Sequence, residues 1–147
     1  MRYAILVLLF GCSSDGDSFG ETRSAALEQT NALRATVGKP ALVETAELTS
    51  YANAGAQFDH GASPHDHFRQ TSGGGVAGAE NECPHWPNGA DLDETVKNCI
   101  DAFWSEGPGE DYSMHGHYIN MTGNYTTMGL GIFVAGDSVT IVQDFGQ

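Results

Sequence analysis

Residues 128–145 read MGLGIFVAGDSVTIVQDF and form the clearest β-hairpin pattern of the chain. Two segments, residues 128–134 and 139–145, are rich in valine, isoleucine and phenylalanine, which favour strands. The residues between them, Ala135-Gly136-Asp137-Ser138, are typical of a hairpin turn. We therefore expect the chain to end in an antiparallel pair of strands. We expect a further strand at residues 117–121.

Upstream of these strands, apolar residues recur at helical spacing in three segments. The three predicted helices cover residues 23–36, 45–58 and 93–104. Gly38 and Pro40 end the first, and Thr45 lies in the N-cap region of the second. Residues 61–78 are rich in Gly, Ser, Pro and His and predict a long loop, with a helical turn at residues 65–70. Helices followed by an antiparallel sheet indicate an α+β fold with the helices packed on the sheet.

Length and charge limit the classes of function. A chain of 147 residues is long enough for one domain and too short for two ordinary ones. It carries 19 acidic and 6 basic residues, so its formal net charge is −13. Such a charge repels a phosphate backbone. We therefore exclude nucleic acid as a partner.

The N-terminus carries a targeting signal. Met1-Arg2-Tyr3 is a short positive start, an apolar run follows, and Leu9-Phe10-Gly11-Cys12 resembles a bacterial lipobox. The resemblance implies a signal peptide at residues 1–11, acylation of Cys12, a flexible tether at residues 12–22 and one domain at residues 23–147. The protein would then be lipid-anchored to the membrane at the bacterial cell envelope, or secreted. An ordinary secretory peptide and a buried first strand are the alternatives.

Two cysteines remain once Cys12 is assigned to the anchor. Cys83 and Cys99 would face an oxidising compartment, where disulfides persist. Their bridge would close a loop of about 16 residues, worth roughly 3 kcal/mol in the chain-entropy model. Two unpaired buried thiols are the alternative. Metal binding by these two cysteines alone does not fit, because neither has a second cysteine or histidine at close ligand spacing except His85.

Three segments concentrate side chains that bind metals or move protons. Glu80 lies in Gly78-Ala79-Glu80-Asn81, Glu106 follows the third predicted helix, and His117 lies in Gly116-His117-Tyr118. Taken singly each is weak evidence, because an isolated glutamate at a helix end is usually solvated. Their order along the chain is more informative than any one of them.

Together with other motifs, these segments resemble the CAP superfamily, which includes cysteine-rich secretory proteins, antigen 5 and plant pathogenesis-related proteins. The motifs in chain order are Leu27 to Leu42 of the first helix and its exit, Phe58-Asp59-His60, Ala79-Glu80-Asn81, Phe103-Trp104-Ser105-Glu106, Gly116-His117-Tyr118 and Gly129-Leu130-Gly131. The resemblance spans nearly the whole chain after the predicted tether. It implies a three-layer α-β-α sandwich with helices packed on an antiparallel sheet.

In that family a cleft lined by two histidines and two glutamates can hold a divalent ion. The resemblance places the glutamates at Glu80 and Glu106 and one histidine at His117. The other histidine falls on His60, which follows the second helix, with His67 as the alternative; His65 also lies close to Glu80 in sequence. Such a set suits zinc or another borderline cation, with water completing an open site.

Three functions remain open at this stage. The first is a binding module in which the cleft holds the cation and engages an envelope, lipid or protein ligand. The second is a metal-assisted hydrolase with Glu80 or Glu106 as general base. The third is a structural envelope protein. The absence of a Ser or Cys nucleophile with an assigned base favours the binding module over the enzyme.

Overall fold

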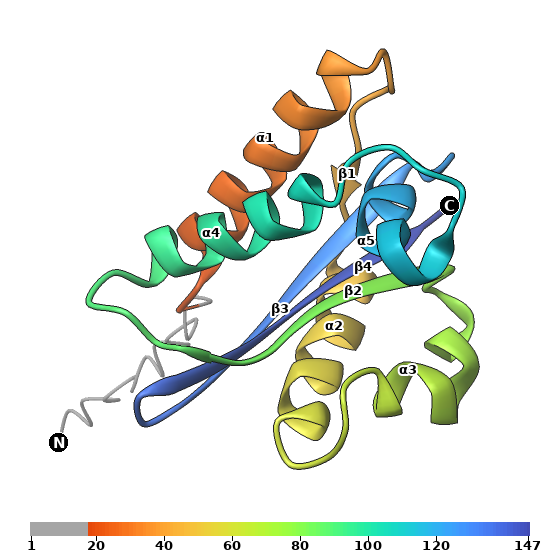
Figure 1. Cartoon of the computed structure of the whole chain (residues 1–147). Coiled ribbons are helices and arrows are strands. Elements are labelled where there is room, and N and C mark those ends of the chain that lie inside the picture. The colour runs from red at the N-terminus through yellow and green to blue at the C-terminus, as the bar shows by residue number, and fades with distance from the viewer. Residues whose placement is uncertain (1–17) are drawn as a thin grey trace, which may run out of the picture.

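The fold is that of a computed structural model, which describes residues 18–147. A four-stranded sheet, in the order β1-β3-β4-β2, forms its middle layer (Figure 1). The strands are β1 (Val43–Glu44), β2 (Ala79–Pro87), β3 (Thr127–Ala135) and β4 (Ser138–Gly146). β4 pairs antiparallel with both β3 and β2, whereas the short β1 runs parallel to β3.

Helices cover both faces of this sheet. On one face lie α1 (Gly20–Thr36) and α4 (Leu92–Ser105), and on the other lie α2 (Ala46–Asp59) and the short α3 (Asp66–Thr71) (Figure 1). A 3-10 turn, η1 (Ser72–Gly75), follows α3, and α5 (Tyr112–Met121) packs beside α4 and β2. The expected three-layer α-β-α sandwich is confirmed.

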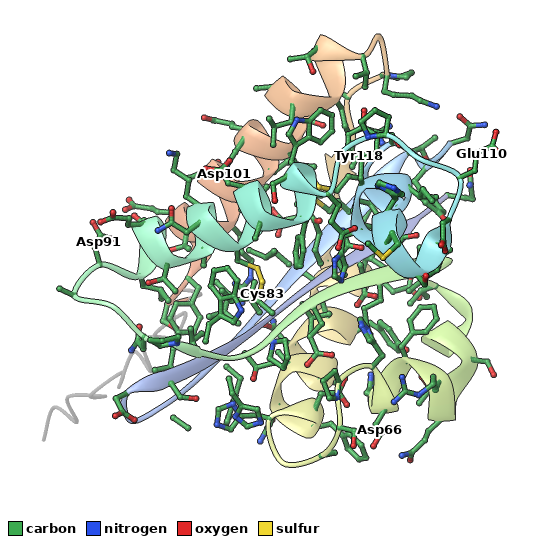
Figure 2. All side chains as sticks on the ribbon, in the orientation of Figure 1. Asp66, Cys83, Asp91, Asp101, Glu110 and Tyr118 are labelled. Atoms are coloured by element: carbon green, nitrogen blue, oxygen red, sulfur yellow. A yellow bond between two sulfur atoms is a disulfide. The ribbon has the colours of Figure 1, made fainter. Side chains whose placement is uncertain are left out.

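The main apolar core lies between the sheet and the α1–α4 layer. Val96, Ile100 and Phe103 of α4 are buried there against Leu130 and Ile141 of the sheet. This placement follows from the apolar stripe of α4, whose other side faces solvent. Figure 2 shows side chains filling this layer around Cys83.

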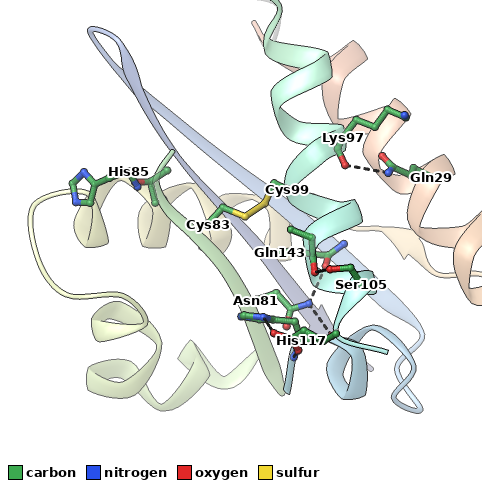
Figure 3. The surroundings of a disulfide bond; sticks show 12 residues. Gln29, Asn81, Cys83, His85, Lys97, Cys99, Ser105, His117 and Gln143 are labelled. Atoms are coloured by element: carbon green, nitrogen blue, oxygen red, sulfur yellow. Dashed lines mark hydrogen bonds and ion pairs between the residues drawn. A yellow bond between two sulfur atoms is a disulfide. The ribbon is translucent and has the colours of Figure 1, made fainter. Parts of the chain in front are cut away.

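A disulfide crosses the same layer. Cys83 on β2 is bonded to Cys99 on α4, with 6.2 Å between their Cα atoms (Figure 3). The predicted pairing of these two cysteines is therefore confirmed. The bond ties α4, which ends at the candidate site, to the edge strand β2.

The opposite layer depends on two glycines of β3. A Cβ at Gly129 would lie 2.3 Å from the backbone carbon of Leu48, and one at Gly131 would lie 2.0 Å from the carbonyl oxygen of Ala52. Only glycine permits so close an approach of α2 to the sheet. The Gly129-Leu130-Gly131 motif is thus a packing site for α2.

The sequence predictions of secondary structure were mostly correct. The three predicted helices are α1, α2 and α4, the helical turn in the loop is α3, and the two strands of the hairpin are β3 and β4. Two strands, β1 and β2, were missed. β2 was not predicted because its buried half, Ala79 to Cys83, carries two glutamates on one face and Asn81 on the other, so it lacks the apolar pattern of a buried strand.

The predicted strand at residues 117–121 is wrong, because these residues form the second half of α5. Asp111 caps this helix, and its side chain accepts a hydrogen bond from the backbone N–H of Ser113 at 2.9 Å. His115 interrupts the helix with a φ of −130°. The break divides α5 into two short helical pieces, so no helical periodicity runs through the whole segment to predict a helix.

The predicted signal peptide and Cys12 lie outside the described residues. Gly20, Glu21 and Thr22, which the sequence analysis placed in the tether, belong to the first turn of α1. None of the helices within residues 18–147 is both long and apolar enough to cross a membrane.

Candidate metal-binding cleft

A cavity of about 630 Å³ opens where α5, the end of α4 and the segment before α3 meet. Its polar lining includes His65, Glu80, Glu106 and His117. Its apolar lining includes Phe68, Ile119 and the ring of Tyr125. The structure therefore brings together three of the residues that the family resemblance selected, Glu80, Glu106 and His117, and adds His65.

The first histidine–carboxylate pair joins His65 to Glu80. His65 Nδ1 lies 2.8 Å from Glu80 Oε1, and the His65 backbone N–H donates to Glu82 Oε2 at 2.6 Å. His65 adopts a left-handed conformation, with φ +63°, just before α3 begins. This conformation is unfavourable for a residue other than glycine. Its two contacts to buried carboxylates hold it there.

The second pair joins His117 to Glu106. Glu106 is the C-cap residue of α4, and its Oε1 lies 2.5 Å from His117 Nδ1. Its other carboxylate oxygen, Oε2, accepts the backbone N–H of His117 at 2.9 Å. The His117 ring also packs on Phe103, with 4.7 Å between ring centroids. Side chain and backbone of His117 are thus both oriented by one carboxylate.

A buried amide network holds α5 against the sheet. Asn81 Nδ2 donates to the carbonyl oxygen of His117 at 3.2 Å and lies the same distance from Gln143 Oε1 (Figure 3). Asn120 Nδ2 donates to the Glu80 carbonyl at 3.1 Å and to Asn81 Oδ1 at 2.9 Å. Both glutamate–histidine pairs are therefore positioned through the same amides. Sequence reasoning quoted Asn81 as part of a motif but missed the roles of Asn120 and Gln143.

These contacts define which atoms are available to a metal ion. In both pairs a carboxylate engages Nδ1, so Nε2 is the remaining ring nitrogen. Metal-binding histidines commonly use one ring nitrogen for the metal and the other for a carboxylate. In addition, ligand atoms of His65, Glu80 and Glu82 all lie within 4.8 Å of one another. The His/Glu group can therefore hold a metal ion.

The structure does not bring His60 to this cleft. His60 follows α2, its Nδ1 lies 2.8 Å from Thr140 Oγ1, and its ring packs at a tilt against that of His85 with centroids 4.4 Å apart. His67 does not line the cavity either: its backbone N–H donates to Asp59 Oδ1 at 2.8 Å and its ring packs on Tyr51. Only His65 of the three pairs with Glu80.

Hydrogen bonding and burial raise the pKa values of three groups at and around the His65–Glu80 pair. The hydrogen bond to Glu80 raises the pKa of His65 above its ordinary value. Burial raises the pKa of Glu82 to about 7, and burial together with the charge of Glu80 raises the pKa of Asp144 to about 9. The buried carboxyls of Glu82 and Asp144, which lie beside Glu80 but do not line the cavity, thus bind protons more tightly than exposed carboxylates do.

The three layers and the histidine–glutamate cleft define a class of small α-β-α sandwich domains. The family model of CAP, described as the Cysteine-rich secretory protein family, matches residues 27–145. The chain therefore belongs to the CAP family. No curated protein sequence matches it.

Solved structures agree with this assignment at the level of the fold. NaASP2, solved with Zn²⁺, has a TM-score of 0.72 and 20% identity, over 92% of this chain and 84% of that one. Na-ASP-1 has a TM-score of 0.71 and 17% identity, over 99% of this chain but only 43% of its own length. A cysteine-rich secretory protein from Staphylococcus aureus has a TM-score of 0.53 and 14% identity, over 86% of this chain and 38% of that one.

Proposed function

We propose that this protein is a membrane-anchored CAP-domain binding module whose cleft holds a divalent metal ion between His65 and His117. The observation that carries the proposal is the pair of Nδ1–carboxylate hydrogen bonds, one made by Glu80 and one by Glu106, in a single cavity. Each bond orients an imidazole and raises its basicity toward a metal.

The donor set favours zinc or another borderline cation. Two imidazole nitrogens with nearby carboxylates suit Zn²⁺, and two protein ligands leave coordination positions for water or for a ligand. The structure of NaASP2 with Zn²⁺, a protein of the same fold, is consistent with this choice. The metal would supply a positive charge in a chain whose formal net charge is −13.

The cavity lining suggests the class of ligand. Phe68, Ile119 and Tyr125 give it an apolar wall, and His65 and His117 give it a polar one. A volume of about 630 Å³ is in the range of small-molecule sites. An amphipathic envelope lipid with an oxygen-bearing head group fits both walls, with the head group at the metal.

The experiment that tests the metal site is a zinc titration of the purified chain by calorimetry. His65→Ala and His117→Ala should each weaken zinc binding by about 10-fold or more, since each removes a proposed ligand. His60→Ala is the matched control and should bind zinc like the wild type. If His60→Ala loses zinc while His65→Ala retains it, the assignment of the first histidine is refuted.

A metal-assisted hydrolase is the competing function. It would use Glu80 or Glu106 as general base toward a bound water. In the structure each of these carboxylates accepts hydrogen bonds around a histidine, which suits an orienting role better. Turnover of an ester or peptide panel that is abolished by a chelator and by Glu80→Gln would favour the enzyme.

Membrane anchoring through Cys12 is the remaining part of the proposal. It is supported by the lipobox resemblance of Leu9-Phe10-Gly11-Cys12. Cys12→Ser should release the protein from the membrane fraction of cells. Retention of that variant in the membranes would contradict the anchor without affecting the metal site.

A further inference from the structure

His115 lies two residues before the proposed metal ligand His117, but it does not line the cavity. Its Nδ1 lies 2.7 Å from the carbonyl oxygen of Glu106 and 3.0 Å from that of Gly107. Carbonyl oxygens only accept hydrogen bonds, so Nδ1 carries the proton and donates to both of them. The His115 side chain therefore holds the main chain at Glu106, the residue whose carboxylate holds His117.

The rest of the His115 ring fits against a glycine of the connection between α4 and α5. A Cβ at Gly109 would lie 2.1 Å from His115 Cδ2 and 2.3 Å from Nε2. The ring thus occupies the space that a side chain at position 109 would need. Together with its bonds to the carbonyl oxygens of Glu106 and Gly107, this contact fixes the path of the connection from the end of α4.

The backbone of His115 also divides α5. With φ −130° and ψ 15° it is not helical. Such a break frees backbone N–H groups from the pairing with residues four positions earlier that a continuous helix makes. Two N–H groups after the break, those of His117 and Tyr118, donate to Glu106 Oε2 at 2.9 Å and 3.5 Å. The break therefore supplies the Glu106 carboxylate with backbone donors.

These contacts form a closed set that joins the end of α4 to α5. His115 binds the main chain of Glu106, and the carboxylate of Glu106 binds both the ring and the backbone N–H of His117. Glu106 is the C-cap residue of α4, and Gly107 follows it with φ +66°. Glycine permits many backbone conformations, so the position of Glu106 depends on contacts from outside the helix. His115 supplies two of these contacts.

We infer that His115 is a positioning residue of the metal site. It fixes the main chain of Glu106 so that the Glu106 carboxylate holds the His117 ring with Nε2 available to the metal. The inference rests on the proposed function, since it concerns the same cleft. His115 is not itself a ligand, because its Nδ1 donates to two carbonyl oxygens and its Nε2 faces Gly109.

The test is the zinc affinity of the purified chain, measured by calorimetry at a temperature where every variant is folded. His115→Ala should bind zinc about 10-fold more weakly than the wild type, as expected when the support of a metal ligand is lost. His115→Asn should restore most of the affinity, because its amide N–H₂ takes the place of Nδ1. His115→Gln should not, because its amide reaches the position of Nε2. His85→Ala, at an exposed histidine outside the cavity, is the matched control and should bind zinc normally.

Double variants separate a positioning role from a general structural one. In the His117→Ala background, His115→Ala should cause no further loss of zinc affinity, because it acts through His117. In the His65→Ala background it should still cause the loss. Equal losses in both backgrounds, or an Asn variant that binds as weakly as the Ala variant, would refute the positioning role. Gly109→Ala, which displaces the His115 ring, is the second variant if His115→Ala does not fold, and it should weaken zinc binding to a similar extent.

The failure of this inference differs from the failure of the proposed function. If the wild type does not bind zinc, the proposed function is refuted and the role of His115 with it. If zinc binding requires His65 and His117 but is the same in the wild type and His115→Ala, only the role of His115 is refuted.

Discussion

Both faces of the sheet are buried, one against α1 and α4 and the other against α2 and α3. The two faces bury different kinds of side chain. The first combines side chains such as Ile100 and Ile141 with the Cys83–Cys99 disulfide. The second combines a small apolar cluster, Ala52, Ala56 and Val142, with the buried carboxylates of Asp59, Glu80, Glu82 and Asp144. Burial of apolar surface stabilises a fold, whereas burial of unpaired charge destabilises it.

One strand, β2, connects the two faces. β2 contributes side chains to both faces: Cys83 points toward α4, whereas Glu80 and Glu82 point to the opposite face and contact His65. The apolar face and the disulfide therefore hold the strand that carries the unfavourable carboxylates. Stability on one face offsets the cost of burying carboxylates on the other.

The largest expected effect comes from damaging the apolar face. Ile100→Ala should lower the free energy of unfolding by about 2–5 kcal/mol, because the side chain is fully buried and leaves a cavity. Chemical denaturation measures this change. Val43→Ala, at a residue that is 64% exposed, is the control and should change stability by under about 0.5 kcal/mol. Similar losses in both variants would contradict the assignment of the core.

Removal of the disulfide should have the next largest effect. The double substitution Cys83→Ser and Cys99→Ser should cost about 3 kcal/mol, as expected for a loop of 16 residues. Zinc affinity at the temperature where the variant stays folded should be preserved, because neither cysteine lines the cleft. A parallel loss of zinc affinity would show that the two faces are coupled more tightly than their contacts suggest.

Substitution of a buried carboxylate on the α2–α3 face should raise the stability of the fold, whereas the two changes above lower it. Since the pKa of Asp144 is raised from 3.8 to about 9 in the folded state, its proton stabilises the fold fully below pH 3.8. That stabilisation is lost as the pH rises toward 9. The wild-type melting temperature, measured in chelator, should therefore fall between pH 6 and pH 8, and Asp144→Asn should reduce the fall and raise the melting temperature at pH 8 by roughly 4 °C. If the melting temperature depends on pH in the same way in both proteins, the raised pKa of Asp144 is refuted.

Sequence patterns were informative where one local signal sufficed. The hairpin of β3 and β4, the amphipathic α4 and the cysteine pair all followed from periodicity, turn residues or cysteine count. The motif around Glu80 and the pair Glu106 and His117 came from the family resemblance. All three of these residues line the cavity.

The first cleft histidine could not be chosen in this way. His60, His65 and His67 lie within eight positions of one another, in a segment without apolar periodicity. The left-handed backbone at His65 and its contacts to Glu80 and Glu82 decide between them. Such a conformation depends on contacts with residues that are distant in sequence, so no local sequence pattern predicts it.

The sequence alone determined helices α1, α2 and α4, the hairpin of β3 and β4, the disulfide and, through the family resemblance, three of the residues that line the cleft. These features depend on short-range periodicity and on motifs whose spacing is preserved in the chain. The tertiary structure decided that residues 117–121 are helical, that His65 faces Glu80, and that Asp59, Glu82 and Asp144 are buried together. The physical reason is that burial of a carboxylate is set by the elements that pack over it, and in sequence a buried aspartate looks the same as a solvated one.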